Sequence, residues 1–425
     1  MKFSMHVPFA LLLAVAVATP VGAAPSTVDH EIRFWEARMP RDPDDYLTPT
    51  KLGAAYLQKA RETGHFAYYL KAREVLQKAL ERKPDHYTAM ASLAGAYAAE
   101  HRFNDAIRLA EKVVAGLPTE PYGYGILGDA YLEMGDVARA EAIYKKLVQM
   151  APGLFSYSRM ANLTHVKGDV DGAIALLKKA AEAGSRINAP AESVAWCHVN
   201  IGEMNFSSGR WAEAEKHYRQ ALKIMPGGYL AMEHLAELRA EQKRYPEALD
   251  LYRQVIAKAP HPDFYAAVAD IHAELNRPAE AKQYRQKALA GYLAAVAEGN
   301  IGYYRHLANY YADTAKDPAE ALKWARKDLE VRKDAHAYDT LAWAHYRAGN
   351  TAEALAAIKK ALAPGTRDAE LFYHAGLIFH RANQDALART YLRRALETNP
   401  RFAEAADARR TLRTLGATSV RNRMP

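Results

Sequence analysis

The amino-acid sequence predicts an all-α fold, a right-handed α-solenoid of about ten helix-turn-helix units. Three observations predict it. A pattern of small and apolar residues recurs about every 34 residues along most of the chain. Each copy divides into two segments whose apolar residues fall at three- and four-residue spacings, as on one face of a helix. Apolar residues that alternate at period two are scarce, so we expect essentially no β-sheet.

Each copy of the pattern has the same marker positions. An apolar residue is followed by a small one near the start, an alanine comes about twelve residues later, and a proline closes many copies. Two examples are Leu127-Gly128 with Ala140 and Pro152, and Ile201-Gly202 with Ala214 and Pro226. The small residue lets two helix backbones approach closely. The proline ends the second helix because its ring clashes with the preceding turn and it has no backbone N–H.

This pattern resembles the tetratricopeptide repeat (TPR) family, whose Leu-Gly, Tyr, Ala and Pro positions are matched in many copies. Ten copies extend over residues 46–400, about five-sixths of the chain. The tryptophan typical of the family is mostly missing, and Tyr124 stands in its place in one copy. The resemblance implies one elongated array in which each unit packs on its neighbours, with no stretch left for a separate catalytic domain.

The N-terminal residues differ from the repeats. Lys2 precedes an apolar run over residues 9–18, and small residues follow it. This is the layout of a secretory signal peptide with cleavage after Ala23, so we expect a signal peptide over 1–23 and a lead-in segment over 24–45. The apolar run is too short for a membrane anchor, and no cysteine stands at the cleavage site for lipid attachment. We therefore expect a periplasmic or secreted protein, similar to exported bacterial TPR proteins.

The C-terminal end is basic. Residues 401–415 are predicted to form one more helix, with a polar outer face that suits a terminal cap, and residues 416–425 are expected to be disordered. From Arg389 onward nine arginines stand against three acidic residues, so the net charge of +8 is largely a C-terminal feature. This end allows weak contact with anionic lipid, whereas export argues against a nucleic-acid partner.

Motifs for catalysis, metal binding or cofactor attachment do not occur in the sequence. The 16 histidines include no His-Glu-x-x-His, and the single Cys197 excludes Cys-x-x-Cys and an internal disulfide. A Gly-x-Ser-x-Gly elbow and a phosphate-binding glycine loop are also missing. We therefore expect neither an enzyme nor a metal or cofactor site, and we expect Cys197 to be a small buried hydrophobe.

The resemblance also places a candidate binding groove, because the first helix of each repeat lines the concave face in TPR arrays. The middle of this groove is predicted to be acidic, with Glu203, Glu233, Glu237, Glu241, Asp270 and Glu274. The C-terminal part is predicted to be aromatic and mixed basic, with Arg305, Asn309, Asp339, Trp343, Tyr346, Arg347, Tyr373, His380 and Arg381. Aromatic and arginine side chains are the types that anchor interfaces. A merely solvated helix face is the alternative interpretation of the same positions.

The sequence thus predicts a non-catalytic exported scaffold that binds a protein or peptide along its concave groove. A cationic and aromatic segment suits the acidic part of the groove, and an acidic segment suits the basic part. The alternative is an accessory protein of exopolysaccharide or cell-envelope assembly or secretion. Exported TPR arrays resemble such proteins, and Trp343, Tyr346 and Tyr373 could stack on sugars.

Overall fold

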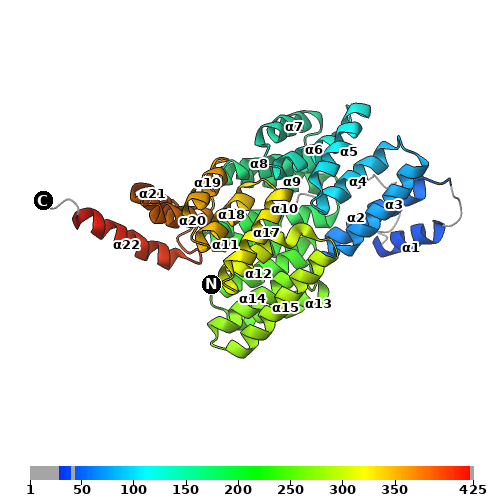
Figure 1. The fold of residues 1–425 in the computed structure, drawn as a ribbon. Coiled ribbons are helices and arrows are strands. Elements are labelled where there is room, and N and C mark those ends of the chain that lie inside the picture. Colours follow the sequence, from blue (N-terminus) through cyan, green and yellow to red (C-terminus); the bar gives the residue numbers. More distant parts are fainter. Residues whose placement is uncertain (1–27, 40–43, 422–425) are drawn as a thin grey trace.

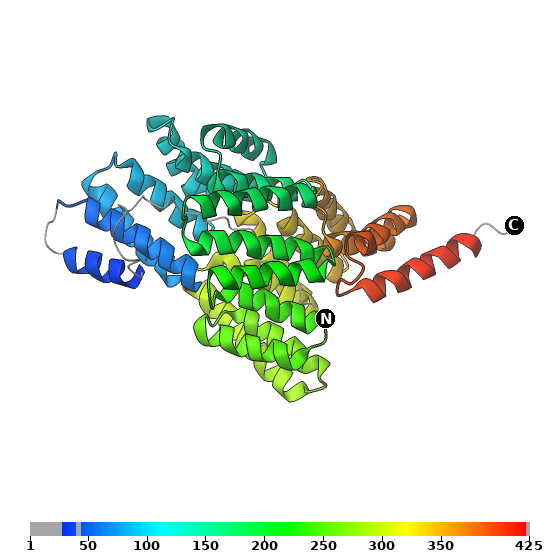
Figure 2. The same cartoon turned by 180° about the vertical axis from the view of Figure 1, so that it is seen from behind.

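The computed structural model describes residues 28–39 and 44–421. Within these ranges the chain forms 22 α-helices and no strand, which confirms the predicted all-α class. Helices α2 to α21 form ten consecutive pairs, in agreement with the ten copies of the sequence pattern. Helix α1 (Val28–Arg38) precedes the pairs, and α22 (Ala405–Arg421) follows them and projects from the body of the molecule (Figures 1 and 2).

The first helices of the pairs, called inner helices below, are α2 (Leu47–Thr63), α4 (Tyr87–Ala99), α6 (Pro121–Glu133), α8 (Leu154–Val166), α10 (Ala191–Ser207), α12 (Tyr229–Glu241), α14 (Pro262–Glu274), α16 (Tyr304–Asn309), α18 (Ala335–Arg347) and α20 (Ala369–Arg381). A 3-10 turn (Ile301–Tyr303) precedes α16, and a π-helical turn (Tyr310–Thr314) continues it. The second or outer helices are α3 (Ala67–Arg82), α5 (Phe103–Gly116), α7 (Val137–Met150), α9 (Val170–Arg186), α11 (Trp211–Ile224), α13 (Tyr245–Lys258), α15 (Pro278–Ala297), α17 (Pro318–Val331), α19 (Thr351–Leu362) and α21 (Asp385–Thr398).

The small residue of the repeat pattern sets the spacing within a pair. A Cβ atom built at Gly128 of α6 would lie 2.4 Å from the ring of Tyr144 in α7. The equivalent atom at Gly202 of α10 would lie 2.3 Å from the ring of Tyr218 in α11. Both tyrosines are fully buried, so the missing side chain is replaced by an aromatic ring of the partner helix. This confirms the steric role expected from the sequence.

The solenoid coils until its own turns touch. The backbone N–H of Lys333 donates to the carbonyl of Glu133 (3.0 Å), and the hydroxyl of Thr366 donates to the carbonyl of Val166 (2.8 Å) across 200 positions. In both cases the turn that joins the two helices of one pair contacts the segment that links two later pairs. The two contacting segments are five and a half repeats apart along the chain. The same offset recurs at three further places, where Gly64 lies beside His261, His101 beside Gly302, and Gly209 beside Asn399. We call this row of five contacts the seam.

Two of the inner helices are buried on every side. All residues of α4 from Ala89 to Ala99 are buried, and so are all residues of α12 from Ala231 to Ala240. Helix α4 packs against α2, α3, α5 and α6, and helix α12 packs against α10, α11, α13 and α14. The seam contacts show that the array is coiled back on itself rather than extended.

The terminal segments differ in part from the predicted boundaries. Helix α22 begins at Ala405 and ends at Arg421, so residues 416–421, which were assigned to a disordered tail, are helical. Gly416 lies inside this helix, and a glycine costs an exposed helix only about 1 kcal/mol, which need not end it. The predicted signal peptide lies outside the described residues. Among the described helices none is long and apolar enough to cross a membrane.

Candidate functional site

Four cavities lie between the described residues of the coil, with volumes of about 320, 220, 160 and 70 Å³. Neighbouring cavities share lining residues. Glu203 of α10 borders three of them, and Asp368 at the start of α20 borders three. The four cavities are therefore parts of one space, called the lumen below. Its walls are mainly inner helices from both turns of the coil, so residues distant in the sequence face each other there.

Negative charge predominates in the lumen. The cavity of about 160 Å³ is lined by one arginine, Arg305, and by three histidines, His306, His336 and His374. Six carboxylates face these groups, namely Asp263, Asp270, Asp313, Asp339, Asp368 and Glu370. The guanidinium of Arg305 is itself engaged, since it donates to Asp328 (3.2 Å) and to Asp334 (3.0 Å). The carboxylates thus outnumber the permanent cations of this wall.

Five of the six predicted acidic groove residues line the lumen. They are Glu203, Glu233, Glu237, Glu241 and Asp270. The sixth, Glu274, is exposed and lies 3.5 Å from the hydroxyl of Tyr245. Three of the five follow one another at four-residue intervals along α12, so they form a stripe of carboxylates on one face of that helix.

Burial raises the pKa of three carboxylates that line the lumen. Desolvation, strengthened by the nearby charge of Glu237, raises the pKa of Glu241 to about 7. Desolvation also raises the pKa of Asp270 to about 6, although Arg285 lies 3.5 Å away and opposes the rise. Burial raises the pKa of Glu133, at the C-terminal end of α6, to about 8, and Asp334 adds to this rise. A positive charge entering the lumen would offset the cost of ionising these groups.

A compact cluster forms on α12 from Glu233, His234 and Glu237. The Nδ1 atom of His234 lies 3.4 Å from Oε2 of Glu237 and 3.5 Å from Oε2 of Glu233. Burial alone would lower the pKa of His234, but Glu233 and the contact with Glu237 outweigh it and raise that pKa to about 10. Burial also raises the pKa of Glu233 to about 8. The ring of Tyr218 stacks on the imidazole, with centroids 5.5 Å apart.

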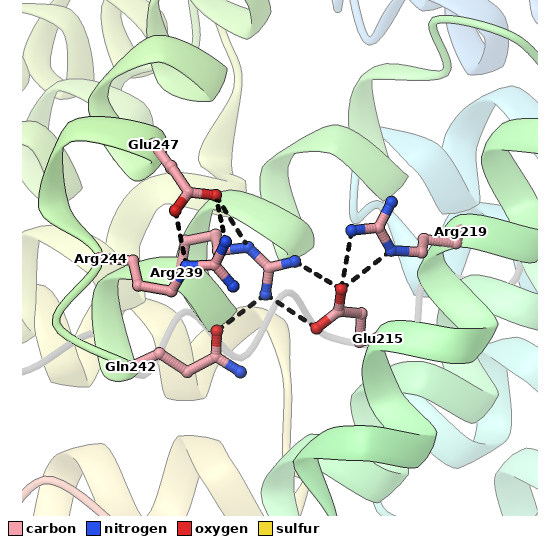
Figure 3. Close-up of polar contacts among 6 residues, drawn as sticks. All are labelled: Glu215, Arg219, Arg239, Gln242, Arg244 and Glu247. Carbon is pink, nitrogen blue, oxygen red and sulfur yellow. Dashed lines mark hydrogen bonds and ion pairs between the residues drawn. The ribbon is translucent and has the colours of Figure 1, made fainter.

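A second set of charges fixes α12 between its neighbours (Figure 3). Arg239 is only 2% exposed and donates to both carboxylate oxygens of Glu215 in α11, at 2.5 and 2.9 Å. It also donates to Gln242 (2.8 Å) and lies 3.6 Å from Glu247 in α13. Arg219 contacts the same Glu215 at 2.8 Å. This network ties three successive helices together and so positions the carboxylate stripe on α12.

The predicted C-terminal groove residues are largely engaged with one another. Trp343 donates to Asp313 (3.0 Å) and stacks on Tyr346 and His374, with centroids 4.8 and 4.0 Å apart. Tyr373 donates to Asp407 of α22 (2.7 Å). The remaining positions behave similarly: Arg347 donates to the carbonyl of Ala312, Arg381 lies over the ring of Tyr346, and His380 contacts Asp385. Asn309 is exposed and Asp339 is buried, and both border the lumen. Contact of these residues with a partner stays a prediction.

Sequence reasoning did not find the residues that the seam brings to the lumen. Glu133, Asp263, Asp334 and Asp368 line the cavities but were not predicted. The repeat pattern defines which face of a helix points inward, but it does not show that an opposite wall lies there. One signal was present in the sequence. Residues 87–99 are apolar around the whole helix, which is typical of a helix buried on all sides.

Comparisons with known proteins agree with the repeat architecture. Three family models described as tetratricopeptide repeats match the chain, one at residues 154–226, one at 69–125, 97–164 and 205–271, and one at 340–408. The chain is 31% identical over 144 residues to human protein O-mannosyl-transferase TMTC3, which is 30% of this chain and 15% of that protein. It is 36% identical over 74 residues to the Hsp70-Hsp90 organizing protein of Triticum aestivum, which is 17% of this chain and 13% of that protein.

The chain thus spans less than a sixth of the length of either relative. Among solved structures, a tetratricopeptide repeat protein from Parabacteroides merdae matches with a TM-score of 0.40 and 16% identity, over 56% of this chain and 93% of that one. The family models together extend over residues 69–271 and 340–408, which is more than half of the sequence. They coincide with the helix pairs and with the glycine positions described above. The chain belongs to the tetratricopeptide repeat family.

Proposed function

We propose that this protein is a non-catalytic scaffold that holds a cationic segment of a protein or peptide partner in its acidic lumen. TPR arrays typically bind protein partners, and the lumen is a concave space that includes a cavity of about 320 Å³. The observation that carries the proposal is the wall of six carboxylates against one arginine. Lysine or arginine side chains of a partner would add positive charge beside these carboxylates and would favour the ionised forms of Asp270 and Glu241, whose pKa values are raised by burial.

The test compares two peptide pools of equal length, one rich in Lys and Arg and one rich in Asp and Glu. Their binding to the full chain is measured by fluorescence anisotropy. We expect the cationic pool to bind and its affinity to fall as salt rises, because the attraction is largely electrostatic. The double substitution Glu241→Gln with Asp270→Asn should weaken binding by about tenfold or more.

The matched control is Asp250→Asn, which removes a carboxylate from the outer helix α13 where its side chain is 63% exposed. This variant should bind like the unmodified chain. Equal binding of both pools, or an unchanged affinity in the double variant, would contradict the proposal.

We further propose that the chain acts after export, in the periplasm or outside the cell. This rests on Lys2, the apolar run over 9–18 and the small residues up to Ala23. Mass spectrometry of the protein from separated cell fractions tests it. The expected result is a periplasmic or secreted chain that begins at residue 24, and an intact N-terminus in the cytoplasm would overturn it.

The glycan-binding alternative finds less support. It relied on stacking by Trp343, Tyr346 and Tyr373, but Trp343 and Tyr373 are only 5% and 6% exposed. Their ring faces are occupied by neighbouring rings, which leaves little area for a sugar. We therefore favour the protein or peptide partner.

A further inference from the structure

The cluster of Glu233, His234 and Glu237 has the composition of a metal-ligand set. It brings two carboxylates and one imidazole together, and one ligand atom from each lies within 4.8 Å of the others. The three side chains are 1%, 3% and 5% exposed. Imidazole and carboxylate groups are common ligands of divalent transition metals. The sequence motifs for such sites did not reveal this one, because a Glu-His-x-x-Glu order is not among them.

Two of the three spacings between the ligand atoms fit a tetrahedral ion, and all three are within 4.8 Å. Bonds of about 2.0–2.1 Å from Zn²⁺ to nitrogen and oxygen place neighbouring ligand atoms about 3.3–3.4 Å apart. The Nδ1 atom of His234 lies 3.4 Å from Oε2 of Glu237 and 3.5 Å from Oε2 of Glu233. The two edges of the tetrahedron that meet at the imidazole therefore already have nearly the required length. The stacked ring of Tyr218 holds the imidazole in this orientation.

A second observation points to a ligand at this place. Atom Oε1 of Glu233, the second oxygen of the carboxylate whose Oε2 faces His234, is buried and has no hydrogen-bond partner among the described residues. A buried carboxylate oxygen without a partner is costly. Two ionised carboxylates beside a neutral imidazole carry two negative charges, which one divalent cation neutralises. The cavity of about 320 Å³, which Glu233 and His234 border, leaves room for a further ligand such as water.

We propose that Glu233, His234 and Glu237 form a binding site for one divalent transition-metal ion, with the imidazole bound through Nδ1. This site goes beyond the scaffold function proposed above, because it requires no peptide partner. The peptide test rests on Glu241 and Asp270, which are not ligands, so failure of one proposal is distinguishable from failure of the other.

The test is a titration of the metal-stripped full chain with Zn²⁺ in competition with a chromophoric chelator. We expect one ion per chain, and we expect Co²⁺ to give the intense visible absorption of a tetrahedral site. His234→Gln and Glu237→Gln should each weaken Zn²⁺ affinity by about 100-fold or more, because each removes one of three protein ligands. Zn²⁺ should also raise the Tm of the unmodified chain and leave that of the two variants unchanged.

The matched control is His374→Gln. His374 is 3% exposed and also lies between two carboxylates, but its Nδ1 faces Asp339 (3.0 Å) and its Nε2 faces Glu370 (3.7 Å). Opposite nitrogens cannot chelate one ion, so this variant should keep the full affinity. Failure of the unmodified chain to bind Zn²⁺, or an equal loss of affinity in His374→Gln, overturns the proposal even if a ligand variant fails to fold.

Discussion

At the scale of single residues, buried charges both stabilise and strain this molecule. Arg239 is satisfied by Glu215, Gln242 and Glu247, so a guanidinium that is 2% exposed costs little (Figure 3). Asp270 is the opposite case, because Arg285 lies 3.5 Å away and only partly offsets the burial of its carboxylate. The first kind of group holds helices in place. The second kind stores free energy that a ligand can release.

Glu215→Gln tests the first kind of group. The hydrogen bonds from Arg239 hold the pKa of Glu215 at about 2, below the value near 4.3 of an unfolded chain. The ion pair therefore stabilises the fold above about pH 4, and this contribution is lost as the pH falls towards 2. At pH 7 the substitution should lower the free energy of unfolding by about 2 kcal/mol. Near pH 2 the difference should vanish.

Urea denaturation at the two pH values measures this effect. Glu213→Gln is the control. Glu213 lies on the same helix, its side chain is exposed, and it forms an ion pair with Lys216 at 3.4 Å. If the control loses the same amount of unfolding free energy, α11 is sensitive to any such substitution. The ion pair with Arg239 would then not explain the effect of Glu215→Gln.

Asp270→Asn tests the second kind of group, and here the substitution is expected to raise the stability instead of lowering it. The pKa of Asp270 is about 6 in the fold and about 3.9 in the unfolded chain, so its ionisation opposes folding as the pH rises from 4 to 6. Relative to the unmodified chain, the variant should gain roughly 1–2 kcal/mol of stability between pH 4 and pH 7.5. Urea unfolding at these pH values checks it. A relative loss instead would show that the pair with Arg285 outweighs the burial.

At the scale of helices, the fold depends on close approach within each pair. The ring of Tyr218 occupies the space where a side chain at position 202 would stand. This relation was predictable, because small residues recur at one position and bulky ones at another. The structure places five of the predicted groove residues along the lumen, namely Glu203, Glu233, Glu237, Glu241 and Asp270, and their contact with a partner stays a prediction. Helical periodicity is a local property, and local properties can be read from a sequence.

Gly202→Ala should destabilise the protein by about 1–3 kcal/mol, because its Cβ would lie 2.3 Å from a fully buried ring. Gly416→Ala is the matched control in a helix of the same chain. No atom lies within 4 Å of a Cβ at position 416, so that variant should be as stable as the unmodified chain, or more stable by up to about 1 kcal/mol. Thermal unfolding of both variants gives the comparison, and a tolerated Gly202→Ala would count against the packing account.

At the scale of the whole molecule, the seam turns a linear array into a closed object. Its contacts join groups 200 positions apart, as in the bond from the hydroxyl of Thr366 to the carbonyl of Val166. These contacts could not be predicted, because they depend on small rotations between repeats that accumulate over five and a half units. Residue types mark only some of these contacts. In the bond from Lys333 to Glu133, only backbone atoms take part.

Thr366→Val should loosen the seam. It removes the hydroxyl that donates to Val166 and leaves a carbonyl without this partner, at a cost of about 1–3 kcal/mol. Hydrogen exchange followed by mass spectrometry should then show faster exchange at residues 165–169 and 364–368 together. The control Thr390→Val removes a hydroxyl that bonds only locally, to Ala386 at 3.0 Å. Faster exchange on one side alone would mean that the two turns are not coupled.

The two sides of the seam are five and a half repeats apart, and this offset limits how the number of repeats can change in evolution. In an open array, a repeat can be duplicated or lost and each remaining unit keeps its neighbours. Here the turn within one pair must meet a link between pairs, as Glu133 meets Lys333. Gain or loss of a single unit between them would shift every later contact by one step and would misalign both walls of the lumen. Copy number in this solenoid is therefore constrained by geometry, in the way that register is constrained in a barrel.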